Sequence, residues 1–501
     1  MSLLNVVKCR SGLALSSVVL GLCAVPVLLS ACGGSSNDSA SAASAASSSA
    51  ESVSVPTLTG RSIIAADTFV AGPTSGQFIN GGDLTTALNT YSYTLPFASK
   101  QPVQGFSALA RDAATDTLYA LQDNGFGGKS ASPDALLHIY AFRPDWASGK
   151  MNSVGFTTGS AVADFDSSSY IRLADPDKKL SFALVADGST YAYPSYSPAG
   201  AASTLSVDAL IKSKRYLTGA DIDPESMVID ADGNFWIGEE FGPWLIKVDK
   251  SGKVLQKEVS VPNVLALDSN PYVQTSNNPN VTTANLPSSG GFESMAINPS
   301  RTRIYTMFER ELSSDSNKQR RIINVFDIAN NKFLSNVWYQ YKVGTGTYID
   351  ASGNTVTEYY TVNDMTAVND HQFLVLEKDR GAGDARTGKF PASNASRVAA
   401  KYKKIYLVDL EKLDSDGFLV KTELVDLMNL ADPKNIGASD TINGVFAFPM
   451  ESIESVRILD ANTLIVVNDN NYPGGSASRN PAKPDNNEFI RIRLPQALSL
   501  Q

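Results

Sequence analysis

Cysteine and histidine are scarce in this chain, and their scarcity excludes several kinds of active site. Among 501 residues there are three cysteines and two histidines, and the cysteines (Cys9, Cys23 and Cys32) all lie near the start. The rest of the chain can therefore form no disulfide and no thiolate metal site. His138 lies in an alternating run and His371 at a turn, which favours structural roles over a Ser-His-Asp triad or a zinc or copper site.

Motifs and charge narrow the possibilities further. The sequence contains neither a Gly-x-Ser-x-Gly nucleophile elbow nor a phosphate-binding loop of the Gly-x-x-x-x-Gly-Lys-Ser/Thr type. Its formal net charge of −9 argues against nucleic acid as the main ligand and suits a protein that collects divalent cations. With 43% hydrophobic and 19% charged residues, the composition is that of a globular protein.

The first residues have the pattern of an export signal. Lys8 and Arg10 precede an apolar run over 13–29, and the tetrapeptide 29–32, Leu-Ser-Ala-Cys, resembles the bacterial lipobox. We expect a signal peptide over 1–31, lipidation of Cys32, a flexible Ser/Ala-rich tether over 32–55 and a folded domain over 56–501. An uncleaved anchor helix or an ordinary signal peptide remains the alternative.

The lipid would be the only attachment of this protein to a membrane. We expect an exported lipoprotein at the outer membrane or the periplasmic face of the cell envelope, and Gly33 after the cysteine favours the outer membrane if the cell is Gram-negative. We find no apolar run after residue 31 that is long enough to span a bilayer. We expect the folded domain to be a monomer.

One layout occurs five times along the chain. Each copy has an acidic or small polar residue, an apolar run, a turn, a second apolar run and an acidic residue that lies 13 to 16 positions after the first. The copies span 106–124, 225–240, 293–310, 364–378 and 454–470. Each copy reads as a two-stranded hairpin, and both ends of a hairpin lie on the same side.

Further strand-like runs would complete each hairpin to four strands. Short strands and regular turns predict an all-β fold, and four-stranded units repeated about an axis form a β-propeller. A further hairpin read over 181–193 gives six blades as our expectation. The run that begins at Ser62 could pair with the strand near Ile490 and close the ring.

A propeller would gather the acidic hairpin ends at one mouth. Carboxylates there repel one another unless cations compensate, and hard cations such as calcium prefer six to eight oxygen ligands. The candidate metal ligands are Asp223, Glu225, Glu239, Glu240, Glu293, Glu309, Asp364, Glu377 and Asp469. For each acid alone, a strand-end carboxylate that binds backbone amides or water remains the alternative.

Basic residues stand beside several of these acids and would suit an anionic ester. Arg310 follows Glu309, and Lys378 and Arg380 flank Asp379. A phosphate ester needs such cations together with a metal that activates water. We take Glu225, Glu239, Glu240, Arg310, Lys378 and Arg380 as the candidate catalytic residues. Local salt bridges are the alternative explanation for the basic residues.

Several of these segments resemble the phytase-like family, described by the esterase-like activity of phytase. The likeness is carried by 221–227, 236–244, 291–296, 374–380 and 466–471, and covers roughly residues 100 to 495. The resemblance implies an exported β-propeller that hydrolyses phosphate or other esters, with calcium at the mouth. Ser226, Ser294 and Ser455 stand where many relatives carry glycine, so no nucleophile is transferred.

Three functions stay open at this point. The first is a calcium-dependent hydrolase of phosphate esters that uses a metal-activated water, with a small anionic ester as substrate. The second is a sugar-lactone hydrolase. The third is a non-catalytic envelope scaffold whose propeller binds a protein or glycan and whose acids only hold a structural calcium ion.

Overall fold

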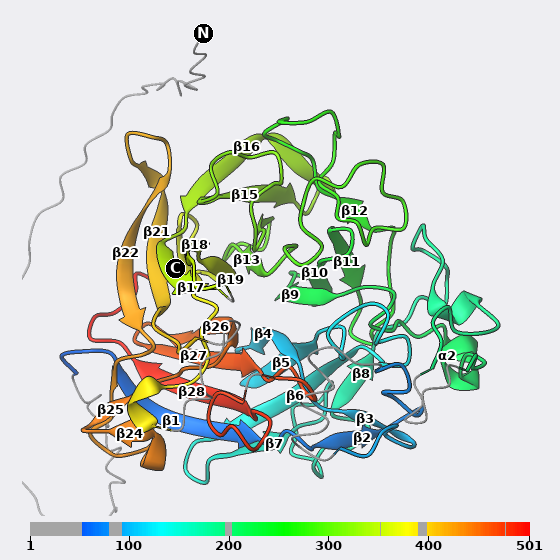
Figure 1. Ribbon diagram of the computed structural model, residues 1–501, viewed down its shortest axis with the longest axis horizontal. Helices are drawn as coiled ribbons and strands as arrows, with labels where there is room; N and C mark the ends of the chain where they lie inside the picture. Colours follow the sequence, from blue (N-terminus) through cyan, green and yellow to red (C-terminus); the bar gives the residue numbers. More distant parts are fainter. Residues whose placement is uncertain (1–52, 80–92, 196–202, 351, 389–397, 476) are drawn as a thin grey trace, which may run out of the picture. The chain divides into compact units, whose positions relative to one another are not determined.

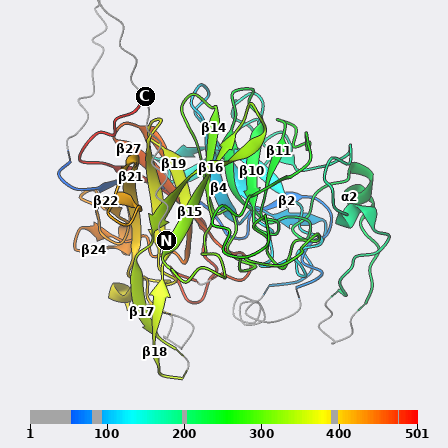
Figure 2. The same ribbon diagram turned by 90° about the horizontal axis from the view of Figure 1, so that it is seen from above.

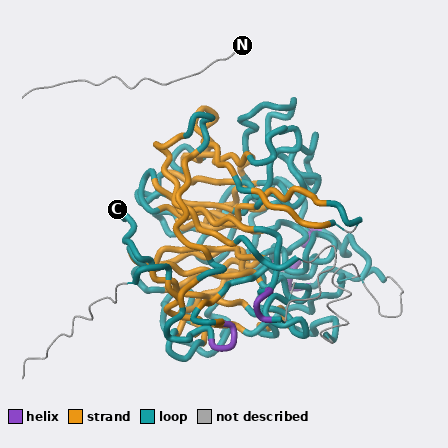
Figure 3. Tube along the Cα trace, turned by 60° about the vertical axis from the view of Figure 1, so that its left-hand side comes forward, coloured by secondary structure: helices purple, strands orange, loops and turns teal. Residues whose placement is uncertain are grey.

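The computed structural model describes residues 53–79, 93–195, 203–350, 352–388, 398–475 and 477–501 (Figure 1). These residues belong to one compact unit, Ser52–Gln501, and are almost entirely strands and loops (Figure 3). The predicted signal peptide, Cys32 and nearly all of the predicted tether lie outside the described residues. Among the residues described, no helix has the length and apolar character needed to cross a membrane.

In the described part of the chain, five four-stranded units form the body of the fold. The first contains β4 (Phe106–Asp112), β5 (Thr117–Gln122), β6 (His138–Asp145) and β7 (Lys150–Ser153). The second contains β9 (Pro224–Ile229), β10 (Phe235–Glu239), β11 (Trp244–Val248) and β12 (Val259–Ser260). The third contains β13 (Ser294–Ile297), β14 (Arg303–Met307), β15 (Arg320–Asp327) and β16 (Lys332–Lys342). The fourth contains β19 (Thr361–Ala367), β20 (Gln372–Lys378), β21 (Lys403–Leu413) and β22 (Leu419–Asp426). The fifth contains β26 (Ser452–Asp460), β27 (Thr463–Asp469), β28 (Asn487–Arg493) and β1 (Thr57–Ile64).

The innermost strands of these units close into a ring. β4 contacts β9, β9 contacts β13, β13 contacts β19, β19 contacts β26, and β26 contacts β4 again. Figure 1 shows the sheets arranged around this common centre. Apolar residues from neighbouring sheets pack together, so the blades bury one another's faces. The predicted all-β propeller is confirmed.

The last blade contains the first strand of the domain. β1 pairs antiparallel with β28, with Arg61 opposite Ile490 and Ser62 opposite Phe489. The predicted closure of the ring is therefore confirmed. A closed ring leaves few free strand edges, and an N-terminal strand held in the C-terminal blade ties both ends of the domain together.

Smaller elements decorate the blades. They are β2 (Phe69–Ala71), β3 (Lys100–Pro102), β8 (Tyr170–Arg172), η1 (Val185–Asp187), α2 (Ala209–Lys214), β17 (Thr345–Ile349), β18 (Thr355–Tyr359), η2 (Ala385–Thr387), β23 (Leu430–Ala431), η3 (Ala438–Asp440), β24 (Thr441–Ile442) and β25 (Val445–Phe446). The β17–β18 hairpin extends beyond the body of the blades (Figure 2).

The sixth blade expected at 181–193 is not found in the described part of the chain. This segment forms the short helix η1 instead of a hairpin. Asp187 accepts a hydrogen bond from the Leu184 amide and forms an ion pair with Arg215 at 2.8 Å, which fixes a tight turn. Phe182 stacks on Trp244 with ring centroids 4.7 Å apart, so the segment packs against the second blade as an insertion.

Asp364 joins two blades and does not line the mouth, although the sequence placed it among the metal ligands. It lies on β19, and its carboxylate forms an ion pair with Arg457 on β26. The Val456 amide and the Ser455 hydroxyl donate to the same carboxylate at 2.7 and 3.1 Å. Arg457 in turn donates to the Leu109 carbonyl of β4. These contacts connect three innermost strands.

Replacing Asp364 by Asn should destabilise the fold, because a buried arginine would lose its counter-charge. Breaking a buried ion pair costs about 3 kcal/mol, and we expect a loss of that order in the free energy of unfolding, measured by urea denaturation. Asp460→Asn is the control, since Asp460 is 61% exposed and lies 3.9 Å from Arg493. A D364N variant as stable as the control would contradict the structural role.

Candidate functional site

A β-bulge at the start of the innermost strands decides which residues face the mouth. In β4, β9, β19 and β26 the register shifts there by one residue. The extra residues are Ser107, Glu225, Asn363 and Glu454. Glu293 holds the same place before β13, since its amide donates to the Gly291 carbonyl at 3.0 Å, as the Ser107 amide donates to Gly105 at 3.1 Å. Bulges commonly re-aim side chains beside functional sites.

A second set of side chains lies where the neighbouring strand of each blade ends. In each blade, the residue after the bulge pairs with a residue of the neighbouring strand. The residue of the second set comes two positions after that pairing partner. They are Asp123, Glu240, Glu309, Lys378 and Asp469. Because side chains alternate along a strand, each of these five side chains lies on the equivalent face of its own sheet. The residue directly before it in the chain lies on the opposite face.

The acids of the two sets form a cluster of carboxylates together with Asp223, which directly precedes β9. We call this cluster the acid ring. Its members are Asp123, Asp223, Glu225, Glu240, Glu293, Glu309, Glu454 and Asp469. Glu225 is half-buried and the others are buried. Lys378 is the basic residue among them, and it is also buried. The predicted convergence of acids from different blades at one mouth is thus what the structure describes.

Burial and like charge together raise the pKa values of carboxyl groups in the acid ring. Burial, followed by the charge of Glu293 and Asp223, raises the pKa of Glu225 well above its usual range. Burial and then Glu454 raise the pKa of Glu293 well above its usual range. For Asp469, burial and then Glu454 raise the pKa to about 7. Groups that interact so strongly titrate as a set and favour bound protons or cations.

Lys378 offsets part of the negative charge. Burial opposes its positive charge, but the nearby Glu454, Glu309 and Glu293 outweigh burial and raise the pKa of Lys378 above its usual value. Its ammonium group therefore stays charged beside these carboxylates. The sequence placed Lys378 in an anion-binding role, and its position among carboxylates gives it a structural role as well.

Two triads within the ring have the spacing of cation sites. Ligand oxygens of Asp223, Glu225 and Glu240 lie within 4.8 Å of one another. Oxygens of Glu240, Glu293 and Glu309 do so as well, and Glu240 belongs to both triads. Carboxylate oxygens in this number fit calcium, which takes oxygen ligands from mono- or bidentate carboxylates. A third group lies away from the ring and consists of His371, at the turn between β19 and β20, with Asp409 and Glu411 on β21.

Glu239 and Glu377 lie outside the ring, although both were candidate ligands and Glu239 a candidate catalytic residue. Each comes directly before a residue of the second set. Glu239 accepts hydrogen bonds from the amides of Phe241, Gly242 and Trp244 at 2.7 to 2.9 Å. Burial raises the pKa of Glu239 to about 8 against the effect of these amides. Its oxygens thus order the turn after β10.

Glu377 is engaged in a network between the third and fourth blades. It accepts hydrogen bonds from the hydroxyl groups of Tyr341 and Tyr402 at 2.6 and 3.0 Å and from the Gly344 amide at 2.7 Å. Lys421 forms an ion pair with it at 2.7 Å. These donors satisfy its carboxylate, so Glu377 is a structural residue.

Two members of the acid ring and one amide residue at the mouth were absent from the candidate ligands. Asp123 and Glu454 are flanking acids of the first and last hairpin copies, so the repeat itself contained the signal for them. Asn363 carried no such signal, because a bulge cannot be read from the spacing of apolar residues. Its side-chain amide donates to Glu454 at 2.8 Å, which places it at the mouth where Asp364 was expected.

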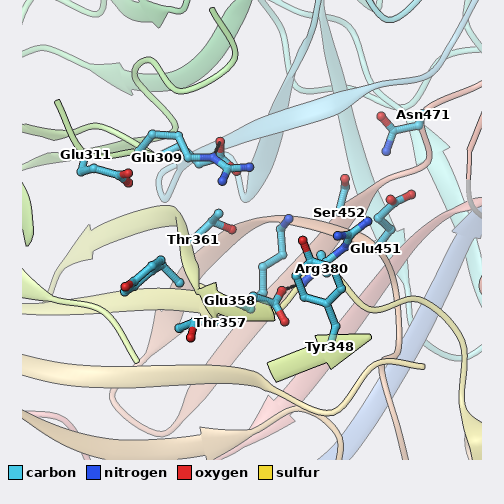
Figure 4. A pocket seen from close by; sticks show the side chains of 13 residues that line it. Glu309, Glu311, Tyr348, Thr357, Glu358, Thr361, Arg380, Glu451, Ser452 and Asn471 are labelled. Atoms are coloured by element: carbon cyan, nitrogen blue, oxygen red, sulfur yellow. Dashed lines mark hydrogen bonds and ion pairs between the residues drawn. The ribbon is translucent and has the colours of Figure 1, made fainter. Parts of the chain in front are cut away.

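A pocket of about 600 Å³ opens beside the acid ring (Figure 4). Glu309 and Lys378 line it and also belong to the ring cluster, and Arg310 and Arg380 line it as well. The β17–β18 hairpin supplies one wall through Tyr348 and neighbouring residues. The Arg380 guanidinium lies over the Tyr348 ring at 4.6 Å, and the Arg380 amide donates to Glu358 at 2.7 Å.

Comparison with known proteins gives distant relatives. An uncharacterized secreted protein of Arthroderma benhamiae is 23% identical over 314 residues, which cover 58% of this chain and 56% of that protein. The chain thus spans about half the length of this curated relative. Among solved structures, the periplasmic gluconolactonase PpgL of Pseudomonas aeruginosa is similar at 13% identity, covering 81% of this chain and 88% of that one, with a TM-score of 0.26. A luciferin-regenerating enzyme is similar at 10% identity, covering 80% and 97%, with a TM-score of 0.29.

A family model gives the assignment. The model described as esterase-like activity of phytase matches residues 101–472, which include the acid ring and the pocket beside it. That match extends over most of the folded unit. The chain therefore belongs to the phytase-like family.

Proposed function

We propose that this protein is an exported hydrolase of phosphate esters. It works with a divalent cation, calcium, that binds at the acid ring. One observation carries the proposal: Glu309 and Lys378 are shared between the carboxylate cluster and a pocket that also presents Arg310 and Arg380. The pocket presents Arg310, Lys378 and Arg380 among the acids Glu309, Glu311, Glu358 and Glu451. A cation-binding cluster beside three basic side chains is suited to an anionic ester that binds together with a cation.

The carboxylates of the two triads fit the cation. All of them except the half-buried Glu225 are buried, and they lie at strand ends. Among the described residues, one of their oxygens, Glu293 Oε2, has no hydrogen-bond partner. A bound divalent cation supplies Lewis acidity, which polarises an ester oxygen and lowers the pKa of water. Asp223, Glu225 and Glu240 are the residues that would hold it within one blade.

The basic residues would bind and orient the substrate. Lys378 offers a charged ammonium group at the boundary of ring and pocket. The side chain of Arg310 is about half exposed and forms an ion pair with Glu309 at 3.2 Å. Its guanidinium group can therefore turn toward an anion. Arg380 is held against Tyr348 on the hairpin wall. Charged hydrogen bonds of this kind fix the position of a phosphoryl group.

The family description and the secreted relative support the proposal from outside the structure. The family is described by the esterase-like activity of phytase, which is hydrolytic. The relative from Arthroderma benhamiae is described as secreted, which agrees with an export signal over residues 1–31. Export of this chain and its lipid anchor are parts of the same proposal.

Turnover of phosphate esters should depend on calcium. The full chain, purified in detergent without chelator, should hydrolyse a panel of phosphomonoesters, lose this activity in EGTA and regain it with added calcium. Activity confined to lactones or carboxyl esters would select the lactone hydrolase or a general esterase instead. A calcium-dependent rise in melting temperature with no turnover on any ester would select the scaffold.

Lys378→Gln should impair the binding of anionic substrates. Loss of a charged hydrogen bond costs about 1.5 to 3 kcal/mol, so kcat/KM on a phosphate ester should fall about 10- to 100-fold. Lys404→Gln is the matched control, because Lys404 is in the same blade and pairs with Glu423 at 2.6 Å on the surface. A K378Q enzyme within twofold of the control would remove Lys378 from the proposed site.

Cys32 should determine where the protein is found. The native protein is expected in the detergent phase of a Triton X-114 partition, and Cys32→Ser is expected in the aqueous phase or retained as an uncleaved precursor. Equal partition of both forms, with cleavage at another position, would favour an ordinary signal peptide.

A further inference from the structure

We infer that the acid ring binds two divalent cations that share Glu240, one held within the second blade and the other bridging the second and third blades. The inference rests on the proposed cation site and adds the number of ions and the residues that hold each. The first set of ligands is Asp223, Glu225 and Glu240, and the second is Glu240, Glu293 and Glu309.

The shared carboxylate has the capacity for both ions. Glu240 Oε1 accepts a hydrogen bond from the Gly291 amide at 2.8 Å, and a carboxylate offers about four lone-pair positions on its two oxygens. The remaining positions are free to face a cation in each triad. The Gly291 contact also fixes the orientation of Glu240 relative to the third blade.

An independent observation points to the second ion. Glu293 is only 8% exposed, and its Oε2 atom has no hydrogen-bond partner in the part of the chain that the structure describes. A buried polar oxygen without a partner is costly. Its triad partners Glu240 and Glu309 each accept a hydrogen bond, from Gly291 and from Arg310 respectively. A cation between Glu240, Glu293 and Glu309 would satisfy the unpaired oxygen.

The charge of the two triads also calls for more than one ion. Five carboxylates take part, and a single divalent cation would leave most of their repulsion in place. Two divalent cations come close to neutralising the five groups. Lys378 lies near Glu293 and Glu309 and contributes one further positive charge.

The two sites should differ in what they do for the fold. The first set comes from the start of β9 and the end of β10, so it is complete within one blade. The second requires Glu240 from one blade and Glu293 and Glu309 from the next. The blades approach closely at this point, since a Cβ on Gly291 would lie 2.5 Å from the Glu240 Cα. The bridging ion therefore joins neighbouring blades.

The full chain, first treated with chelator, is titrated with calcium in an isothermal calorimeter. The titration should show that two ions bind per chain. Glu293→Gln should retain one ion, and Glu240→Gln should lose stoichiometric binding of both. Glu358→Gln is the control, since Glu358 lines the neighbouring pocket outside both triads and its amide oxygen can still accept from the Arg380 amide. This control should keep two ions.

Melting temperatures measured with and without calcium show whether Glu293 is an ion ligand or has only a structural role. Without calcium, Glu293→Gln should melt above the native chain, because it removes one acid from a cluster whose members repel one another. With calcium, the variant should gain less than the native chain, because the bridging ion is lost. One ion in the native chain, no binding at all, or unchanged stoichiometry in both ligand variants would overturn the inference.

The result separates this inference from the proposed function. Two ions without turnover on any ester would leave the inference standing and refute the hydrolase. Calcium-dependent turnover with one ion per chain would do the reverse.

Discussion

Mutual repulsion among buried carboxylates is the constraint on which the rest of this structure depends. The acid ring gathers eight acids at one mouth, and burial together with like charge raises the pKa of members such as Glu225 and Glu293 well above the usual range. Such a cluster would disperse on a flexible chain. The acid cluster stays together here because the five innermost strands form a closed ring. In addition, β1 pairs with β28 and so joins the last blade to the start of the domain.

The same repeat produces two kinds of acid, and the alternation of side chains along a strand separates them. Glu240 faces the ring, whereas its neighbour Glu239 faces away and binds three backbone amides. Asp364 and Glu377 are likewise satisfied by donors within the protein. Fully bonded acids stabilise the blades, and the unsatisfied Glu293 oxygen remains available to a ligand.

The five repeated hairpins, the all-β propeller and the closing strand could be read from the sequence, because apolar alternation and turn residues are local signals. The acidic mouth followed, since a hairpin returns to its starting side. The sixth blade did not follow, because the ion pair of Asp187 with Arg215 joins positions far apart in the chain and folds that segment into η1. The candidate ligand at Asp364 was displaced by one position for a similar reason: the bulge puts Asn363 at the mouth.

The sequence by itself determined the strand pattern, the scarcity of cysteine and histidine that leaves oxygen ligands, and the set of acids from which a ring could be built. Only the tertiary structure decided which acids face one another. A one-residue shift in pairing moves a side chain to the opposite face of its strand, and the partners that fix this shift come from other blades. For that reason Glu240, Glu293 and Glu309 meet although they are distant in the chain, while Glu239 and Glu240 are adjacent and serve different purposes.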